Sequence, residues 1–96
     1  MPTDIENAEI RHNQEATAFE VFLDGRRSWL EYVPENGSIV ITHVIVHPDL
    51  RGQGLAERLM RTGLEYARRN SLRVIPQCAY AQAFFRRHPE EQQLLK

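Results

Sequence analysis

The sequence has a single cysteine and no long apolar run. One cysteine, Cys78, excludes an internal disulfide and is typical of a protein in a reducing cytoplasm. The longest strongly apolar run, residues 39–46, is interrupted by Thr42 and His43 and is too short to span a bilayer. Residues 1–10 are acidic and lack the apolar segment of a secretory signal. We therefore expect a cytoplasmic protein that does not enter a membrane.

The sequence also lacks internal repeats, low-complexity tracts and linkers. Its 96 residues are near the lower end of what can bury a core of its own. Apolar residues make up 42% and charged residues 26%, which is ordinary globular composition rather than that of a disordered tail. We expect one domain covering residues 1–96.

Basic residues are scarce in the first half of the chain. Residues 1–50 carry three arginines and nine acidic residues, a net charge of −6, whereas residues 51–96 have a net charge of +5. The basic half suits an anionic partner, although arginines that only solvate helix surfaces explain the same asymmetry. The arginine pairs are too scattered for a nucleic-acid-binding stripe. The four histidines and Cys78 lack the spacing of a metal site, so we predict neither nucleic acid nor metal as a ligand.

Alternation of apolar and polar residues predicts antiparallel strands in the first half of the chain. The alternating segments are residues 8–13, where the pattern is weak, and residues 16–25 and 27–33. Asp24-Gly25 and Asn36-Gly37 are dipeptides that favour tight hairpin turns. Residues 38–46 are apolar on both faces, which is typical of a central, covered strand.

The hydrophobic period changes to 3.6 residues between Gly54 and Asn70, which predicts an amphipathic helix. Residues 71–76 then read as a short strand, and residues 79–88 as a second helix closed by Pro89. The order is β-β-β-β-α-β-α. This is an α+β fold with a mixed, mostly antiparallel sheet of about five strands and two helices. The helix between the last two strands implies that these are parallel, joined by a right-handed crossover.

A tight turn, Arg51-Gly52-Gln53-Gly54, separates the apolar strand from the first helix. The first amides of a helix lack intrahelical acceptors, and the helix dipole places partial positive charge there. Glycines without Cβ atoms let a phosphate approach these amides closely, and Arg51 can add a charged contact. The turn lacks the Lys-Ser/Thr of a Walker loop and the three spaced glycines of a dinucleotide fingerprint. A pyrophosphate held by one short loop is the remaining interpretation.

Residues 51–56 resemble the acyl-CoA signature Q/R-x-x-G-x-G/A of the GNAT superfamily of N-acetyltransferases, with matches at Arg51, Gly54 and Ala56. Nearly the whole chain, and residues 43–89 most closely, is similar to a small subfamily of YjdJ-type, N-acetyltransferase domain-containing proteins. Further marks of the resemblance are Ile75-Pro76-x-Cys78-x-Tyr80 and His88-Pro89. The resemblance implies a minimal GNAT fold, without the helical segment that helps to build the acceptor site of larger relatives.

The resemblance also implies acetyl-CoA, or coenzyme A, as cosubstrate in a notch where the fourth and fifth strands separate. The backbone of the strand end would pair with the pantetheine arm, the turn amides would hold the pyrophosphate, and two aromatic rings would pack against pantetheine or adenine. The residues of the strand end are Val44, Ile45 and Val46. The turn amides are those of Arg51, Gly52, Gln53, Gly54, Leu55 and Ala56, and the aromatic rings are those of Tyr80 and Phe84.

Amine acetylation requires a base for the amine, a polarised thioester carbonyl and a proton for the departing thiolate. Many larger relatives carry a glutamate base on the fourth strand. This chain has no acidic residue between Glu35 and Asp49, but it has His43 near the same place. His43 is a candidate base, a residue that orients Cys78, or a structural histidine.

Cys78 lies at or near the start of the last helix, where the helix terminus favours a thiolate. It is a candidate acetyl acceptor, a general acid or a wall of the pocket. Tyr80 is either an acid for the sulfur or a helix aromatic. His12 and His88 are expected at the surface, and His47 at the exit of the strand.

The interpretation that we carry forward is an N-acetyltransferase that moves the acetyl group of acetyl-CoA to a primary amine of a small molecule or a peptide lysine. One alternative is a CoA-binding module without turnover, acting as a sensor or a partner subunit. Another is a structural domain whose glycine turn only packs closely. We expect a monomer or a weak homodimer.

Overall fold

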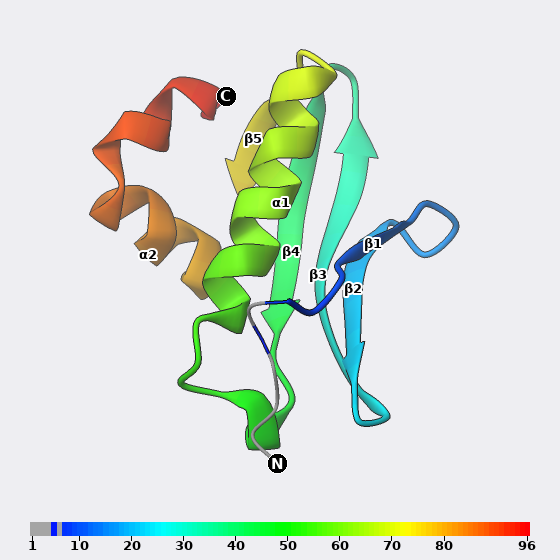
Figure 1. Ribbon diagram of the computed structural model, residues 1–96. Coiled ribbons are helices and arrows are strands. Elements are labelled where there is room, and N and C mark those ends of the chain that lie inside the picture. Colours follow the sequence, from blue (N-terminus) through cyan, green and yellow to red (C-terminus); the bar gives the residue numbers. More distant parts are fainter. Residues whose placement is uncertain (1–4, 6) are drawn as a thin grey trace.

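A computed structural model describes Ile5 and residues 7–96 of the chain (Figure 1). The expectation of no signal segment in residues 1–10 falls partly outside the described residues. The order of the elements is β-β-β-β-α-β-α, as predicted. They are β1 (Arg11–Asn13), β2 (Ala18–Leu23), β3 (Arg26–Glu35), β4 (Ser38–Ile45), the 3-10 turn η1 (Pro48–Leu50), α1 (Leu55–Arg69), β5 (Arg73–Pro76), α2 (Ala79–Arg87) and the 3-10 turn η2 (Pro89–Leu94).

The five strands form one sheet in the order β1-β2-β3-β4-β5. The first four pair antiparallel, and β5 pairs parallel with β4, which confirms the predicted parallel pair. Both predicted hairpin turns form. Asp24 and Gly25 have φ of 53° and 76°, and Gly37 has φ of 71°. These left-handed conformations match the twist of the flanking strands.

One part of the prediction needs correction. β1 contains only residues 11–13, because residues 8–10 precede the first pairs with β2 and do not enter the ladder. α2 ends at Arg87, within one residue of the predicted end and before Pro89, as expected. Pro89 begins η2, since a proline fits the first position of a helical turn, where its missing N–H is not needed.

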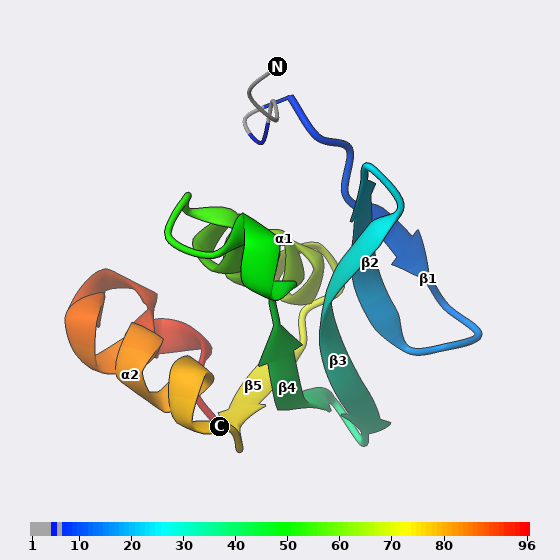
Figure 2. The same ribbon diagram turned by 90° about the horizontal axis from the view of Figure 1, so that it is seen from below.

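α1 lies in the curve of the sheet and covers one of its faces (Figure 2). Its predicted apolar stripe is buried, with Leu59, Leu64 and Ala67 at 0% exposure. The sheet contributes the other side of this core through alternate residues of β2, β3 and β4, which are Phe19, Val21, Leu30, Tyr32, Ile39 and Ile41. α2 lies beside the β5 edge and packs next to β4 and β5 (Figures 1 and 2).

The face of the sheet away from α1 is partly open. Phe22, Val33 and Ile45 are 59%, 46% and 37% exposed. The expectation that residues 38–46 are covered on both faces therefore holds only for the first half of β4, where residues 39–41 are buried. The second half of β4 extends past β5 and remains accessible, and this part of the strand positions the candidate site.

Candidate functional site

The glycine turn is held at both ends by buried leucines. Leu50 and Leu55 are 2% and 1% exposed, while residues 51–54 between them are exposed. Gly52 and Gly54 adopt left-handed conformations with φ of 78° and 83°. A Cβ at either position would meet no atom within 4 Å, so the space in front of the turn is open. The glycines are required by the backbone conformation and leave the amides accessible.

The amides that follow Arg51 in this turn lack acceptors among the described residues. The Arg51 amide donates weakly to the Pro48 carbonyl, and the helical ladder of α1 begins with the Arg58 amide on the Gly54 carbonyl at 3.1 Å. Among the described residues, the amides of residues 52–57 contact no acceptor. These donors lie at the positive end of a 15-residue helix. The arrangement is suited to binding an anion.

A pocket of about 190 Å³ lies in front of the turn and extends to α2. Its walls come from the end of β4, from the turn itself and from Tyr80 of α2. They are Val46, Leu50, Arg51, Gly52, Gly54, Leu55, Ala56, Glu57 and Tyr80. Burial, followed by the nearby charge of Glu57, raises the pKa of the Tyr80 hydroxyl, so this group stays protonated and can donate a hydrogen bond.

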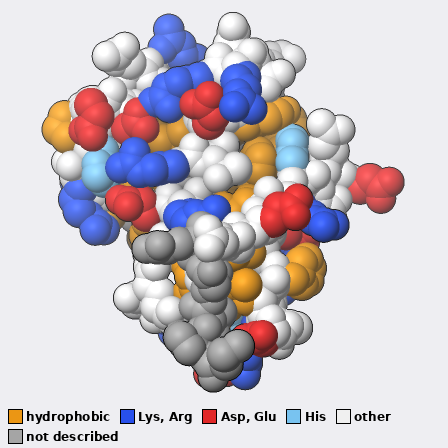
Figure 3. Space-filling view, viewed as in Figure 1, with side chains coloured by type: hydrophobic (Ala, Val, Ile, Leu, Met, Phe, Trp, Pro, Cys, Tyr) orange, Lys and Arg blue, Asp and Glu red, His pale blue; other side chains and the backbone are white. Residues whose placement is uncertain are grey.

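Arg51 differs from three of the four arginines of α1. Arg61, Arg68 and Arg69 each pair with a glutamate on α1 or η2. Figure 3 accordingly shows acidic and basic side chains side by side over α1. The Arg51 Nε instead donates to the Val46 carbonyl at 3.2 Å, and no carboxylate of the described residues pairs with it. Solvated helix arginines thus account for much of the basic half, but Arg51 stays available to an anion.

A notch opens where β4 and β5 separate. The pairing of these strands ends at Ile41 and Pro76, whereas β4 continues to Ile45. The amides of Gln77 and Cys78 both donate to the Ile41 carbonyl, at 3.0 and 3.2 Å, and the chain then leaves the sheet and enters α2. In the described part of the chain, no strand therefore pairs with the rest of β4, which includes Val44 and Ile45, on its β5 side.

Cys78 is partly buried at the N-cap of α2 beside this notch. Its Sγ accepts a hydrogen bond from the Ala81 amide at 3.4 Å. The predicted position at the start of the helix is confirmed.

His43 lies on the open face of the sheet, away from α1, and its side chain is 61% exposed. Its Nδ1 is 2.8 Å from Oε2 of Glu31 on β3, and the Thr42 hydroxyl donates to the same oxygen at 2.7 Å. These hydrogen bonds, that of Thr42 first, hold the pKa of the Glu31 carboxyl below its usual value. No hydrogen bond joins His43 to Cys78 among the described residues. The structure therefore gives no support to the interpretation that His43 orients Cys78.

Glu31 is the residue that the sequence did not single out. Counting back from the two-residue hairpin at Asn36-Gly37 would place Glu31 opposite Thr42. Tyr32 pairs with Ile41 as this count expects, but a β-bulge shifts the register at the next residue, so that Glu31 pairs with His43. The sequence offered one signal. The count from the hairpin places Glu31 one residue out of register with His43 on the next strand.

Phe84 is a core residue in this structure rather than a wall of the pocket. It is 2% exposed, and its ring lies 4.4 Å from that of His88 and beneath the Arg61 guanidinium. The physical reason is helical spacing, since Phe84 shares the buried side of α2 with Ala81 and Phe85. Tyr80 lies at the margin of that side and reaches the pocket.

Two histidines expected at the surface are packed instead. His12 stacks on Phe19 at 4.2 Å and hydrogen-bonds the Tyr32 hydroxyl, and burial lowers its pKa. His88 caps the C-terminus of α2 and lies 3.6 Å from Glu57. His47 accepts from the Asp49 amide at the exit of β4, as predicted.

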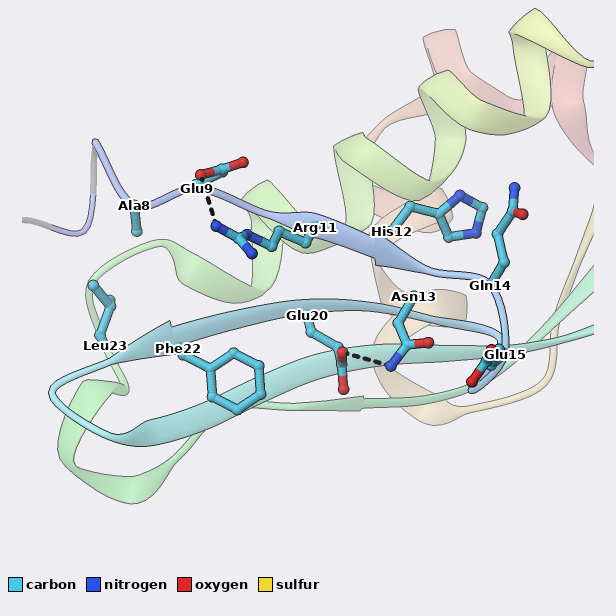
Figure 4. Close-up of a pocket in the computed structure, with 10 residues that line it drawn as sticks. All are labelled: Ala8, Glu9, Arg11, His12, Asn13, Gln14, Glu15, Glu20, Phe22 and Leu23. Atoms are coloured by element: carbon cyan, nitrogen blue, oxygen red, sulfur yellow. Dashed lines mark hydrogen bonds and ion pairs between the residues drawn. The ribbon is translucent and has the colours of Figure 1, made fainter.

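A larger hollow of about 800 Å³ lies along β1 and β2 (Figure 4). Several of the polar and charged groups in it are paired with their neighbours. The Asn13 amide donates to Glu20 at 3.0 Å, and Arg11 pairs with Glu9 at 3.6 Å. The hollow shares no residue with the glycine turn or the notch. Cavity volume alone therefore does not identify the functional site. The amides of residues 52–57, which have no acceptor in the described chain, indicate the smaller pocket instead.

No group of three or more histidine, cysteine or acidic side chains in the described part of the chain is arranged to hold a metal ion. No helix of that part of the chain combines the length and apolar character needed to cross a membrane.

Comparisons with known proteins agree with this geometry. A family described as GCN5-related N-acetyl-transferase matches residues 18–94. The solution NMR structure of a GCN5-like candidate N-acetyltransferase from Staphylococcus aureus is similar, with a TM-score of 0.75 and 26% sequence identity. That similarity covers 94% of this chain and 89% of the other. No curated protein matches the sequence significantly.

Proposed function

The chain belongs to the GCN5-related N-acetyltransferase family, and from this premise we propose that it binds acetyl-CoA at the glycine turn and transfers the acetyl group to a primary amine. One observation carries the proposal. The amides of residues 52–57, free of acceptors within the described chain, open into a pocket between the turn and Tyr80.

The turn fits a diphosphate for three reasons. Its amides are hydrogen-bond donors at a positive helix end, its glycines allow close approach, and Arg51 adds a positive charge without a competing carboxylate. From there, the pantetheine arm would follow the unpaired edge of Val44, Ile45 and Val46 in the notch. Tyr80 would pack against it, and Phe84 would support Tyr80 from the core.

The chemistry that this site would perform is a simple acyl transfer. The amine nitrogen attacks the thioester carbonyl, a C–N bond forms and the C–S bond breaks. The amine loses a proton to a base, and the thiolate of coenzyme A gains one. His43 lies on β4 just beyond the last β4–β5 pair, which makes it the candidate base. Cys78 and Tyr80, on the α2 side of the notch, are the candidates for the proton donor or for pocket walls.

Calorimetric titration tests binding. Acetyl-CoA and dephospho-CoA should bind with similar enthalpy if the pyrophosphate is the main anchor, and free pantetheine should bind far more weakly. Pantetheine that bound as well as acetyl-CoA would contradict a pyrophosphate site at the turn.

Transfer of isotope-labelled acetyl from acetyl-CoA to a panel of amines tests catalysis. The panel should include spermidine, an N-α-acetyl-lysine amide and small aminoalcohols. Binding without transfer to any of them would favour the alternative of a CoA-binding module. Absence of both would favour a structural domain, in which case Gly54→Val would lower only the stability of the fold, through the backbone strain at that position.

A further inference from the structure

Glu31, Thr42 and His43 form a small hydrogen-bonded group on the open face of the sheet. The Glu31 Oε2 atom accepts from the Thr42 hydroxyl at 2.7 Å and is 2.8 Å from the His43 Nδ1. The bulge between β3 and β4 creates this group, because it brings two consecutive β4 residues against one β3 carboxylate. Bulges recur where a strand must aim a side chain at a functional site.

The contacts define the tautomer of His43. The Glu31 carboxylate, whose pKa is held low by Thr42 and His43, is an acceptor only. The Nδ1 of His43 must therefore carry the hydrogen of the shared bond. In the neutral imidazole the lone pair is then on Nε2, for which the described residues supply no partner.

Glu31 is itself a poor candidate for the base. Its contacting oxygen already accepts two hydrogen bonds, and its low pKa leaves it little affinity for a proton. Besides His43, the other charge that acts on it is on its own strand. Arg27 on β3 acts on Glu31 at a distance, but its guanidinium is paired with Glu20 on β2 at 2.6 Å.

We propose that Glu31 is a positioning residue for His43, which it holds with Nδ1 protonated so that Nε2 takes the proton from the acceptor amine on the open face of the sheet. This inference rests on the proposed function. In the transfer step the amine proton passes to Nε2, the C–N bond forms and the C–S bond breaks. Glu31 stays ionised throughout and stabilises the imidazolium that forms.

The test combines NMR with kinetics on four variants of the full chain. They are Glu31→Gln, Glu31→Ala, His43→Ala and, as a matched control, Glu35→Gln. Glu35 is an exposed residue of the same strand, so its change removes the same charge without touching His43. The probes are the imidazole ¹⁵N shifts of His43, acetyl-CoA titration, and the pH profile of acetyl transfer to spermidine and N-α-acetyl-lysine amide.

We expect His43 to be the Nδ1–H tautomer in the unmodified protein and a mixture in Glu31→Ala. Removing the carboxylate should lower kcat about ten- to hundredfold, as for other carboxylates that orient a functional histidine. The acidic limb of the kcat/KM profile should move to lower pH in Glu31→Gln, since the imidazolium loses its anionic partner. The affinity for acetyl-CoA should be unchanged in the Glu31 variants, and the control variant Glu35→Gln should keep the kcat and pH profile of the unmodified protein.

Three results would overturn the inference. An Nε2–H tautomer in the unmodified protein would remove its geometric basis. Full activity in His43→Ala would refute it while leaving the proposed function intact. Acetyl-CoA binding without transfer to any amine would instead refute the proposed transferase function, and the role of Glu31 with it.

Discussion

Substitution of Gly54 perturbs the proposed cofactor site in a way that can be separated from protein stability. Gly54 has φ of 83°, a conformation that costs a residue with a Cβ atom about 1–2 kcal/mol. Because a Cβ there meets nothing within 4 Å, no steric clash adds to this strain. For a domain of this size, Gly54→Val should lower Tm by about 4–8 °C per kcal/mol.

The effect on binding should be larger than this strain implies. The valine methyl groups would project toward the space in front of the turn and separate a phosphate from the amides of residues 54–57. Each hydrogen bond from an amide to a charged oxygen contributes about 1.5–3 kcal/mol. Losing one or two of them should weaken acetyl-CoA binding about a hundredfold, since 1.4 kcal/mol corresponds to a factor of ten.

The matched control is Gly37→Val in the β3–β4 hairpin. Gly37 has φ of 71° and, like Gly54, open space where a Cβ would lie. Both variants should therefore lose similar stability by thermal unfolding, and only Gly54→Val should lose affinity by calorimetry. Equal acetyl-CoA affinities in the two folded variants would refute the claim that the turn amides hold the diphosphate.

Three more changes have defined outcomes. Arg51→Ala should weaken acetyl-CoA binding about fivefold, as expected for a surface ion pair of about 1 kcal/mol, and the difference should shrink at high salt in calorimetry. Cys78→Ser should retain acetyl-CoA affinity and slow transfer less than about a hundredfold, which is the lower end of a general acid's contribution. The initial-velocity lines of direct transfer should intersect. Parallel lines, together with complete loss of transfer in the serine variant, would show an acetyl-cysteine intermediate. Burial lowers the pKa of His12, so the folded state binds fewer protons at this imidazole than the unfolded state does. The contribution of the neutral imidazole to the free energy of unfolding is complete above pH about 6.5. It is lost as the pH falls toward the lowered pKa of His12 in the folded state. Urea unfolding of His12→Phe should therefore depend less on pH across that window than unfolding of the unmodified protein, and an unchanged dependence would contradict the burial of a neutral imidazole.

Sequence patterns predicted the features that lie within one contiguous segment. The glycine turn, a helix beginning near Gly54 and the position of Cys78 near the start of α2 depend on residues that are neighbours along the chain. Their backbone preferences act locally, so a strand followed by a turn and a helix could be identified without tertiary information. The resemblance of residues 51–56 to an acyl-CoA signature rests on the same local geometry.

Side-chain contacts between distant segments were not predicted. His12 looks like a surface residue in its own segment, yet it packs against Phe19, Tyr32 and Tyr66 from two other strands and α1. The Glu31–His43 pair depends on a single inserted residue in the β3–β4 ladder. Alternation predicts which face of a strand a residue occupies, but a one-residue change of register decides which side chain it meets on the next strand.

β4 is where the two halves of the candidate site meet, and its alternation explains why they remain separate. Val44 packs against the core on the side of α1, whereas His43 and Ile45 are exposed on the open face. A cosubstrate held by the glycine turn and an amine that reaches His43 would thus approach the thioester from different sides of one strand. Neither has to leave before the other arrives, which favours direct transfer over a relay through Cys78. The open face that this requires exists because no element of the described chain covers the outer side of β2 and β3 near Phe22 and Val33.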